Sequence, residues 1–263
     1  DAEAALSDAV ETGAVIAHYQ PIVALGDRRL AGFEAMARWD RPGEGVMGPE
    51  DFIPLAGEMD LLGAIGEQVR AAAADDLSAW RAARGRVREL FVSANADARE
   101  IAAPGFADTL IELVAASGLP RGAYKLEIAE TEVMRDPEAC LDTLTRLREA
   151  GIALVLDDFG TGWSSLARLD RFPFDIIKVD QYFVRAARSD EQARRVIESV
   201  VSLARNYSNL VVAEGVEDEA AADLVAELGC DYAQGFVFAG ALTPQAAAEA
   251  ARDGLPGRAD APA

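Results

Sequence analysis

Histidine is almost absent from this chain of 263 residues, which contains His18 and no other. Catalysis by a Ser-His-Asp or Cys-His unit would have to use this residue, and so would a zinc site rich in histidine. His18 lies in the apolar run 14–25, where we expect a packed or half-exposed side chain. A hydrolytic metal is therefore expected to have oxygen ligands, which favours magnesium, manganese or calcium.

Cysteine is nearly as scarce. Cys140 and Cys230 stand far apart in the sequence, and neither belongs to a CxxC motif. This usage fits a reducing compartment, so we expect two buried thiols in a cytoplasmic protein or a cytoplasmic module of a larger one.

Positive charge is also in short supply, with 25 basic against 45 acidic residues and a net charge of −20. A grip on the backbone of DNA or RNA needs a basic surface, so no nucleic-acid polymer is expected as a partner. An anionic substrate would require bound cations that reverse the local charge.

Long apolar runs are missing too, since no run reaches the roughly 18–20 residues that span a bilayer, and no signal peptide opens the sequence. We therefore expect no membrane segment. The chain starts at Asp1 rather than Met, which is compatible with a module excised from a larger protein.

Short apolar runs alternate with longer segments of helical period. The predicted strands are 15–25, 30–39, 90–94, 124–128, 152–156, 174–179, 210–213 and 232–238. The predicted helices are 61–83, 106–117, 138–150, 191–206, 219–228 and 244–252. This alternation indicates an α/β protein with a parallel sheet, and eight strands in this length favour a TIM-type (β/α)8 barrel, which needs roughly 250 residues.

The first two predicted strands depart from this pattern. About four residues, 26–29, separate them, too few for a crossover helix, so they should pair antiparallel in a modified barrel. The Gly- and Pro-rich segment 41–59 is predicted to be a loop with a short helix from Pro49. We expect one domain over residues 1–253 and a disordered tail over 254–263.

Polar residues interrupt or end nearly every predicted strand. They are Glu34, Asn95, Glu127, Asp157, Asp158, Lys178, Asp180, Glu214 and Gln234. Most lie at the carboxyl end of a strand, and these ends meet at one mouth of a β/α barrel, where catalytic groups gather. A carboxylate buried there alone is costly, so the set calls for a cation or water.

Two adjacent carboxylates follow the fifth predicted strand. Neighbouring side chains on a regular strand point to opposite faces, so Asp157 and Asp158 cannot both point inward. We expect Asp157 to end the strand and Asp158 to turn with the loop 159–165. Such a pair suits a site where two metals about 4 Å apart clamp a phosphoryl group.

Each of these residues alone has a structural explanation. A strand-end Asp is more often a helix cap, and Glu127 could form an ion pair with a nearby Arg or Lys. The set is harder to explain in that way. Glu34, Asn95, Glu127 and Asp157 supply oxygen ligands from four separate strands.

Eight ordered motifs make the chain similar to the EAL-domain phosphodiesterases, over roughly residues 5–250. They are YQPIV (19–23), GFEAMARW (32–39), VSAN (92–95), LEIAE (126–130), DDFGTGWSSL (157–166), IKVD (177–180), AEGVE (213–217) and QGFVF (234–238). A protein kinase is excluded, because the HRD loop and the VAIK lysine are absent despite the DFG triplet.

The resemblance assigns roles to these positions. It implies that Glu34, Asn95, Glu127 and Asp157 hold one Mg²⁺ or Mn²⁺, with Asp157 and Asp158 serving a second. It implies that Glu214 is the general base, with Lys178 beside it orienting water or phosphate. Substrate-contacting or supporting positions are Gln20, Arg38, Asp180, Glu217 and Gln234, and Glu130 steadies the loop 159–165.

The reaction implied by the resemblance is hydrolysis of cyclic di-GMP to linear pGpG, by in-line attack of a metal-bound water. Calcium prefers looser coordination and is expected to inhibit. The resemblance also implies a homodimer, formed by the loop 159–165 and the helix after Asp180, and it is compatible with an upstream sensor or GGDEF domain.

The sequence departs from the family pattern at a few positions. Met36 replaces a leucine of similar volume and should be tolerated. Ala129 and Thr131 differ from the usual LEITES, close to the loop support, so regulation is more affected than chemistry. The VSANAD segment replaces the commoner VSVNLS but keeps Asn95, and 239–241 lack the usual proline.

Two other functions compete with hydrolysis. A degenerate member of the family would bind cyclic di-GMP as a receptor without cutting it, although such members usually lack a ligand or base that is present here. A Schiff-base enzyme would use Lys178 as a nucleophile, but the surrounding carboxylates favour the charged lysine and oppose this role.

Overall fold

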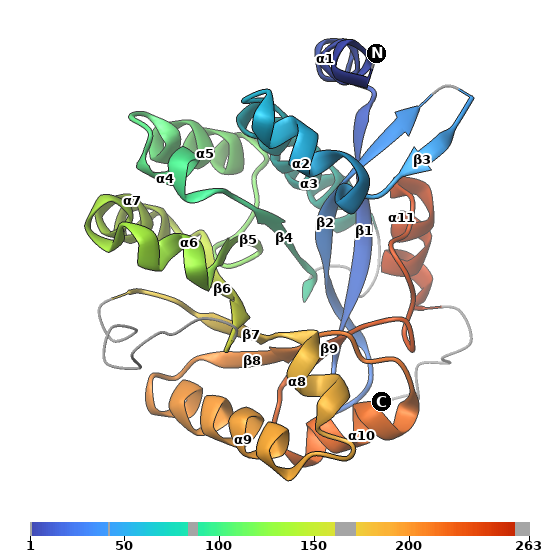
Figure 1. Ribbon diagram of the computed structural model, residues 1–263, viewed down its shortest axis with the longest axis vertical. Helices are drawn as coiled ribbons and strands as arrows, with labels where there is room; N and C mark the ends of the chain where they lie inside the picture. The colour runs from blue at the N-terminus through green and yellow to red at the C-terminus, as the bar shows by residue number, and fades with distance from the viewer. Residues whose placement is uncertain (1, 42, 84–88, 161–171, 256–263) are drawn as a thin grey trace.

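A computed structural model of the chain describes residues 2–41, 43–83, 89–160 and 172–255. Eight strands form a closed barrel (Figure 1). They are β1 (Val15–Ala24), β2 (Leu30–Arg41), β4 (Phe91–Asn95), β5 (Tyr124–Ala129), β6 (Ala153–Phe159), β7 (Ile176–Val179), β8 (Leu210–Ala213) and β9 (Tyr232–Gln234). A ninth strand, β3 (Gly45–Met47), extends the sheet beside β2.

The barrel closes through one reversed strand. The strand order is β1-β9-β8-β7-β6-β5-β4-β2, and β1 also pairs with β2. Strand β1 runs antiparallel to both of its neighbours, whereas the other seven barrel strands run parallel to one another. The connection between β1 and β2 is too short for a crossover helix, which forces this reversal. The predicted modified barrel is confirmed.

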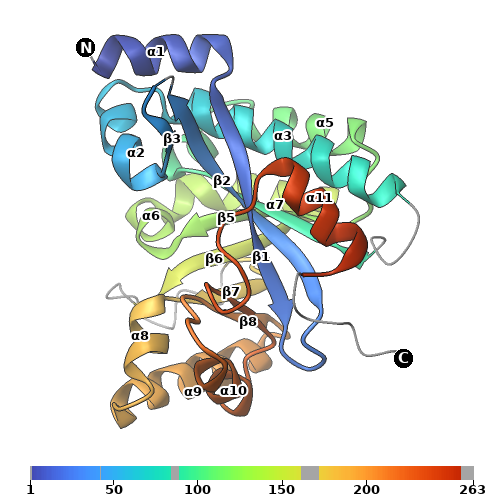
Figure 2. The same ribbon diagram turned by 90° about the vertical axis from the view of Figure 1, so that its right-hand side faces the viewer.

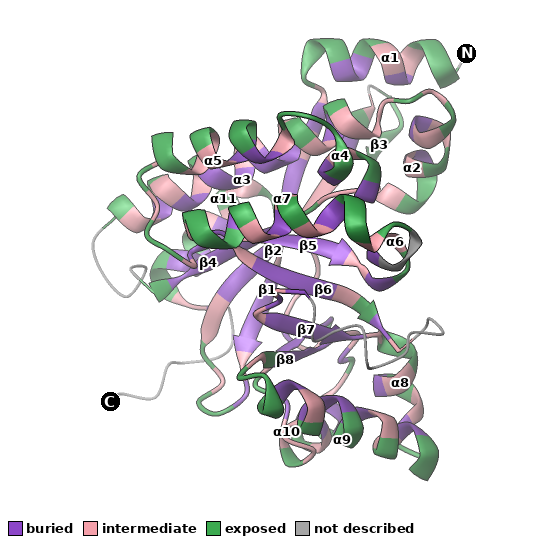
Figure 3. Ribbon diagram, turned by 90° about the vertical axis from the view of Figure 1, so that its left-hand side faces the viewer, coloured by how far each residue is buried: buried purple, intermediate pink, exposed green. Residues whose placement is uncertain are grey.

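Helices cover the outside of the barrel, and their outward faces are exposed while the strands are buried (Figure 3). The helices are α1 (Ala2–Thr12), α2 (Pro49–Glu58), α3 (Leu62–Ala82), α4 (Ala98–Ala102), α5 (Phe106–Ala116), α6 (Glu130–Arg135), α7 (Pro137–Ala150), α8 (Gln181–Ala186), α9 (Glu191–Asn206), α10 (Glu219–Glu227) and α11 (Pro244–Asp253). The six predicted helices match within one residue at each end.

Part of the acidity serves these helices. The aspartates that precede α4, α7, α8, α9 and α10 each accept a hydrogen bond from a backbone N–H of the first turn. Such caps stabilise a helix by about 1 kcal/mol each. The side chain of Thr243 caps α11 in the same way.

An apolar layer fills the lower half of the barrel. Ile22, Phe91, Val155, Ile176 and Val212 form this cluster, with Tyr232 packed against it. Phe91, Val155, Ile176 and Tyr232 each lie two residues before a polar side chain of the same strand. Side chains two positions apart on a strand point to the same face. The predicted polar residues of those strands therefore lie inside the barrel, directly above an apolar floor.

Two predicted segments and three helices differ from the predictions. In the segment 41–59, α2 confirms the short helix predicted from Pro49, whereas β3 was not predicted; the apolar residues of this segment pack with α1 and Trp39 in a second small core. The predicted strand 232–238 ends at Gln234, since the Phe238 N–H donates to the Gly235 carbonyl in a turn. The helices α1, α4 and α6 were not predicted.

The rare residues lie where the sequence suggested. His18 is 8% exposed, and Cys140 and Cys230 are buried free thiols. Of the predicted tail, Leu255 is buried in the core, and residues 256–263 lie outside the described part of the chain.

Helix α1 and the last turn of α11 lie at opposite ends of the barrel (Figure 2). Because β1 is reversed, its first residues and α1 lie at the end where the parallel strands finish. Among the described residues, we find no helix long and apolar enough to cross a membrane.

Gly32 is required by the apolar layer, so its replacement tests the packing. A Cβ at this position would lie 2.6 Å from both the ring and the carbonyl oxygen of Phe91, whereas Gly26 has nothing within 4 Å. We expect Gly32→Ala to lower the free energy of unfolding by about 1–3 kcal/mol, a cost usual for overpacking. Urea denaturation measures it. Gly26→Ala should stay close to wild type, and equal losses in both variants would contradict this packing.

Candidate functional site

Lys178 is the centre of a ring of carboxylates at the carboxyl end of the barrel. Its Nζ lies 3.0 Å from Glu34, 2.7 Å from Glu127, 3.3 Å from Asp157 and 2.8 Å from Glu214. The lysine is 1% exposed. The four acidic residues come from β2, β5, β6 and the end of β8, so barrel closure brings together residues up to 180 positions apart in the sequence.

Amide side chains complete this ring around Glu34. The Asn95 Nδ2 donates to Glu34 at 3.1 Å, and the Gln234 Nε2 donates to Glu34 at 2.7 Å and to Gln20 at 3.1 Å. Burial raises the pKa of Glu34, but Lys178 and these donors outweigh it and hold the pKa below the ordinary value. The buried Oε1 of Gln234 has no hydrogen-bond partner among the described residues.

One ammonium does not balance this many carboxylates. Burial and the charge of Glu34 raise the pKa of Glu127 to about 8, and burial and Asp157 raise the pKa of Asp158 to about 6. Burial and neighbouring acids raise the pKa of Glu214 well above its ordinary value. Without a further cation the ring therefore holds protons in place of part of its negative charge, and a divalent cation bound there would displace them.

The pKa of Lys178 moves in the other direction. Burial alone would lower it, but the charges of Asp157, Glu127 and Glu214 raise it well above the ordinary value. The lysine is held as an ammonium, which opposes the Schiff-base role. Lys125 is the other lysine of the chain, and it lies lower on β5, where burial lowers its pKa to about 8.

A β-bulge delivers both aspartates to the mouth. We predicted that this strand ends at Asp157, but β6 continues to Phe159. Leu156 is paired with Ile177 and Phe159 with Val179, so β6 contains one extra residue, and Asp158 adopts a left-handed φ of 55°. Bulges of this kind re-aim side chains next to active sites.

The bulge creates a group of acids that could hold a metal ion. Among the described residues, Asp157, Asp158 and Glu214 each offer an oxygen, and these oxygens lie within 4.8 Å of one another. Oxygen ligands at such spacing suit a hard divalent cation. The resemblance assigned Glu214 to proton transfer, and the geometry also brings it into this acidic group.

Glu130 lies where a loop support is needed. It is 1% exposed, and its carboxylate accepts the Gly160 N–H at 3.0 Å. The contact joins the start of α6 to the residue that follows β6. Residues 161–171, which include most of the predicted loop 159–165, lie outside the described part of the chain.

Three predicted substrate residues lie outside the hydrogen-bonded ring. Arg38 lies further along β2 and donates to the carbonyl of Ala37 at 2.8 Å. The carboxylate of Asp180 accepts the Tyr182 N–H at 2.8 Å and so caps α8. Glu217 forms an exposed ion pair with Arg185 at 2.8 Å.

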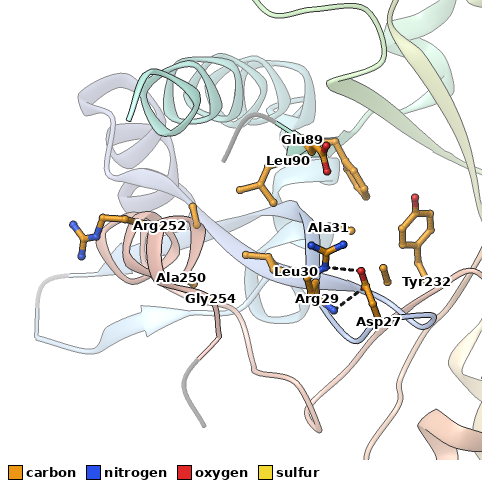
Figure 4. A pocket seen from close by; sticks show the side chains of 13 residues that line it. Asp27, Arg29, Leu30, Ala31, Glu89, Leu90, Tyr232, Ala250, Arg252 and Gly254 are labelled. Carbon is orange, nitrogen blue, oxygen red and sulfur yellow. Dashed lines mark hydrogen bonds and ion pairs between the residues drawn. The ribbon is translucent and has the colours of Figure 1, made fainter. Parts of the chain in front are cut away.

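A cavity of about 490 Å³ lies at the opposite end of the barrel and contains no predicted site residue (Figure 4). Its lining includes Arg29 and Asp27, which are paired with each other, and Tyr232. The apolar layer separates this cavity from the ring. Chemistry in β/α barrels takes place at the carboxyl ends of the strands, so the cavity's size does not make it the site.

The sequence matches the EAL domain family over residues 3–241. The Pseudomonas aeruginosa protein MucR, whose name is bifunctional diguanylate cyclase/cyclic di-GMP phosphodiesterase, is 34% identical over 233 residues, covering 89% of this chain and 34% of MucR. An Azorhizobium caulinodans protein is 35% identical over 245 residues, covering 91% and 33%. The chain thus spans about a third of the length of the curated relatives it matches.

Solved structures agree with this match. A PaMucR phosphodiesterase in complex with c-di-GMP superposes with a TM-score of 0.86 at 32% identity, covering 92% of this chain and 97% of that one. The EAL enzyme Bd1971, in a form bound to cAMP and cyclic di-GMP, gives a TM-score of 0.89 at 28% identity, covering 95% and 68%.

Replacement of Lys178 tests the charge balance of the ring. Lys178→Met leaves buried carboxylates without their cation, so we expect a loss of about 3–5 kcal/mol in the free energy of unfolding. The measurement is urea denaturation in the presence of EDTA. Lys125→Met is the matched control inside the same barrel, and it should cost far less, because burial already disfavours that charge. A similar loss in both variants would contradict the balance described here.

Proposed function

This chain belongs to the EAL domain family, and we propose that it is a metal-dependent phosphodiesterase that opens cyclic di-GMP to linear pGpG. The observation that carries the proposal is the ring itself, in which every predicted ligand, the predicted base and the lysine lie together at the barrel mouth. The name of MucR and the c-di-GMP complexes of PaMucR and Bd1971 support the choice of substrate.

Two groups of residues would hold the metals. Asp157 and Asp158, which lie beside Glu214 in the acidic group, would hold one cation. Glu34, Asn95, Glu127 and Asp157 would hold the other, with Lys178 sharing the carboxylates of Glu34 and Glu127. We propose Mg²⁺ or Mn²⁺, which suit carboxylate and amide oxygens. When bound, such metals lower the pKa of water and offset phosphate charge.

The protein's own groups would then act on the water and the phosphate. Glu214 is the proposed general base, and its side chain is 18% exposed, so it is open to the mouth while its Oε1 is held 2.8 Å from Lys178. The ammonium of Lys178 fixes that carboxylate and supplies a positive charge for a phosphate oxygen.

Residues around the ring would bind the substrate. Arg38 suits a phosphate, because a guanidinium donates two parallel hydrogen bonds. Gln20 and Gln234 offer amide groups at the ring, and Asp180 and Glu217 lie on the segments that follow β7 and β8. Glu130 is proposed to couple this site to the loop 159–165.

The partners follow from the same family. We propose a homodimer that uses α8 and the loop 159–165, and a cytoplasmic location for the domain, where a nucleotide second messenger would be found. In a longer protein, an upstream sensor or GGDEF domain is compatible with the name of MucR, of which the chain covers 34%. The acidic net charge supports no DNA or RNA partner.

Removal of a ring carboxylate tests the proposed reaction. Glu34→Ala and Asp157→Ala should each lower turnover at least about 100-fold, because one metal ligand and its charge are lost. Product analysis for pGpG with magnesium measures this effect. Glu44→Ala, which removes an exposed carboxylate paired with Arg41, is the control and should turn over as wild type does. Wild-type turnover by Glu34→Ala would refute the assignment. Binding without product in the unaltered protein would favour a receptor, and reductive trapping with a carbonyl substrate would favour a Schiff-base enzyme.

Metal exchange gives a second test. We expect turnover with Mg²⁺ or Mn²⁺ and inhibition by Ca²⁺, which takes more ligands at longer distances and holds the site in a looser geometry. The measurement is pGpG formation with each metal after EDTA treatment. Equal turnover with calcium would contradict the proposed site.

A further inference from the structure

Arg70 is a buried arginine on α3, behind the strand end that carries Asn95. It is 5% exposed, and its guanidinium lies over the ring of Phe106 at 5.2 Å. An arginine in an amphipathic helix is usually a surface residue, so the sequence gives no sign that Arg70 is buried. A buried guanidinium must have partners, and those of Arg70 point toward the site.

The guanidinium of Arg70 bridges a backbone carbonyl and a carboxylate. Its Nη1 donates to the carbonyl oxygen of Asn95 at 3.0 Å, and its Nη2 donates to Glu100 at 2.5 Å. The other oxygen of Glu100 accepts the Asp97 N–H at 3.1 Å. The pair therefore ties α3 to both ends of the turn between β4 and α4.

The opposite side of this turn is tied to the ring. The Ala96 N–H donates to the backbone carbonyl of Glu127 at 2.9 Å, and the Asn95 side chain donates to Glu34 at 3.1 Å. The backbone of Asn95 is thus fixed from α3 on one side and from β5 on the other. Loss of the Arg70 contact would release one of these two restraints.

A glycine makes room for this guanidinium. Gly66 lies one turn before Arg70 in the interior of α3, where glycine costs roughly 1 kcal/mol relative to alanine. A Cβ at Gly66 would lie 2.6 Å from Nη1 of Arg70, the atom that bonds Asn95. At Gly63, in the same helix, the nearest atom would be Glu100 Oε1 at 3.9 Å, an ordinary contact.

We propose that the Arg70–Glu100 pair is a positioning device for the metal site, because it fixes the carboxyl end of β4 and so aims the Asn95 amide into the ring. The proposal rests on the proposed function for the identity of Asn95 as a ligand. It assigns no contact with substrate to Arg70. Groups that orient a metal ligand in this way typically change metal affinity by 10–100-fold when they are removed.

Mn²⁺ binding to the metal-free protein tests the pair without reference to activity. The protein is titrated with Mn²⁺, and the electron paramagnetic resonance signal reports the free ion. The dissociation constant for Mn²⁺ should be about 10-fold or more higher in Arg70→Ala than in wild type. Arg70→Lys keeps the charge, but a single ammonium cannot bond both partners as the planar guanidinium does. Its Mn²⁺ affinity should therefore lie between those of Arg70→Ala and wild type.

The two helix glycines supply a matched pair. Gly66→Ala should weaken Mn²⁺ binding several-fold although alanine favours the helix, whereas Gly63→Ala should bind as wild type does. Leu6→Ala, in the second small core, is a control for lost stability alone. It should lower the thermal midpoint and leave Mn²⁺ affinity unchanged.

The outcomes separate this inference from the proposed function. The positioning role would be overturned by any of three results: wild-type Mn²⁺ affinity in Arg70→Ala, equal effects of Gly66→Ala and Gly63→Ala, or no Mn²⁺ binding by the unaltered protein. If Arg70→Ala does not fold, the comparison of Gly66→Ala with Gly63→Ala tests the positioning role. If the unaltered protein binds Mn²⁺ with an affinity that depends on Arg70 but yields no pGpG, only the phosphodiesterase proposal would be overturned.

Discussion

The ammonium of Lys178 lies within 3.3 Å of an oxygen of each of four carboxylates, inside a barrel with an apolar floor. Several like charges at this depth repel one another strongly, and they are tolerated only when a cation and hydrogen-bond donors compensate them. The amides of Asn95 and Gln234 supply two of those donors to Glu34. The architecture therefore gathers more carboxylates at one mouth than its ammonium and donors can keep charged, which is the condition that favours a divalent ion.

Two irregularities allow a repetitive fold to build this ring. The reversal of β1 brings Gln20 opposite Glu34 and next to the strand that carries Gln234. The extra residue in β6 aims Asp157 and Asp158 into the same mouth, which a regular strand cannot do. Aspartate tolerates the left-handed backbone that this bulge needs better than most residues. Both features lie at the site, where departures from regular structure are expected to have a function.

Much of this could be read from the sequence, because it depends on local patterns. Strand–helix alternation, the short link after β1 and strand-end polar residues predicted the barrel and the members of the ring. The extra residue of β6 could not be predicted, since it appears only in the pairing of Leu156 with Ile177 and of Phe159 with Val179. The burial and role of Arg70 could not be predicted either, because tertiary packing brings its partners Asn95 and Glu100 to it.

The reversed first strand also sets the polarity of any fusion. Strand β1 starts at the carboxyl ends of the parallel strands, so α1 sits on the same side of the barrel as the ring, while α11 ends beside the opposite cavity. A regular eight-fold barrel would present its amino terminus at the far end. In a longer polypeptide, a domain joined before α1 would be connected at the end of the barrel where the ring lies. A domain joined after α11 would be connected at the end of the barrel away from the ring.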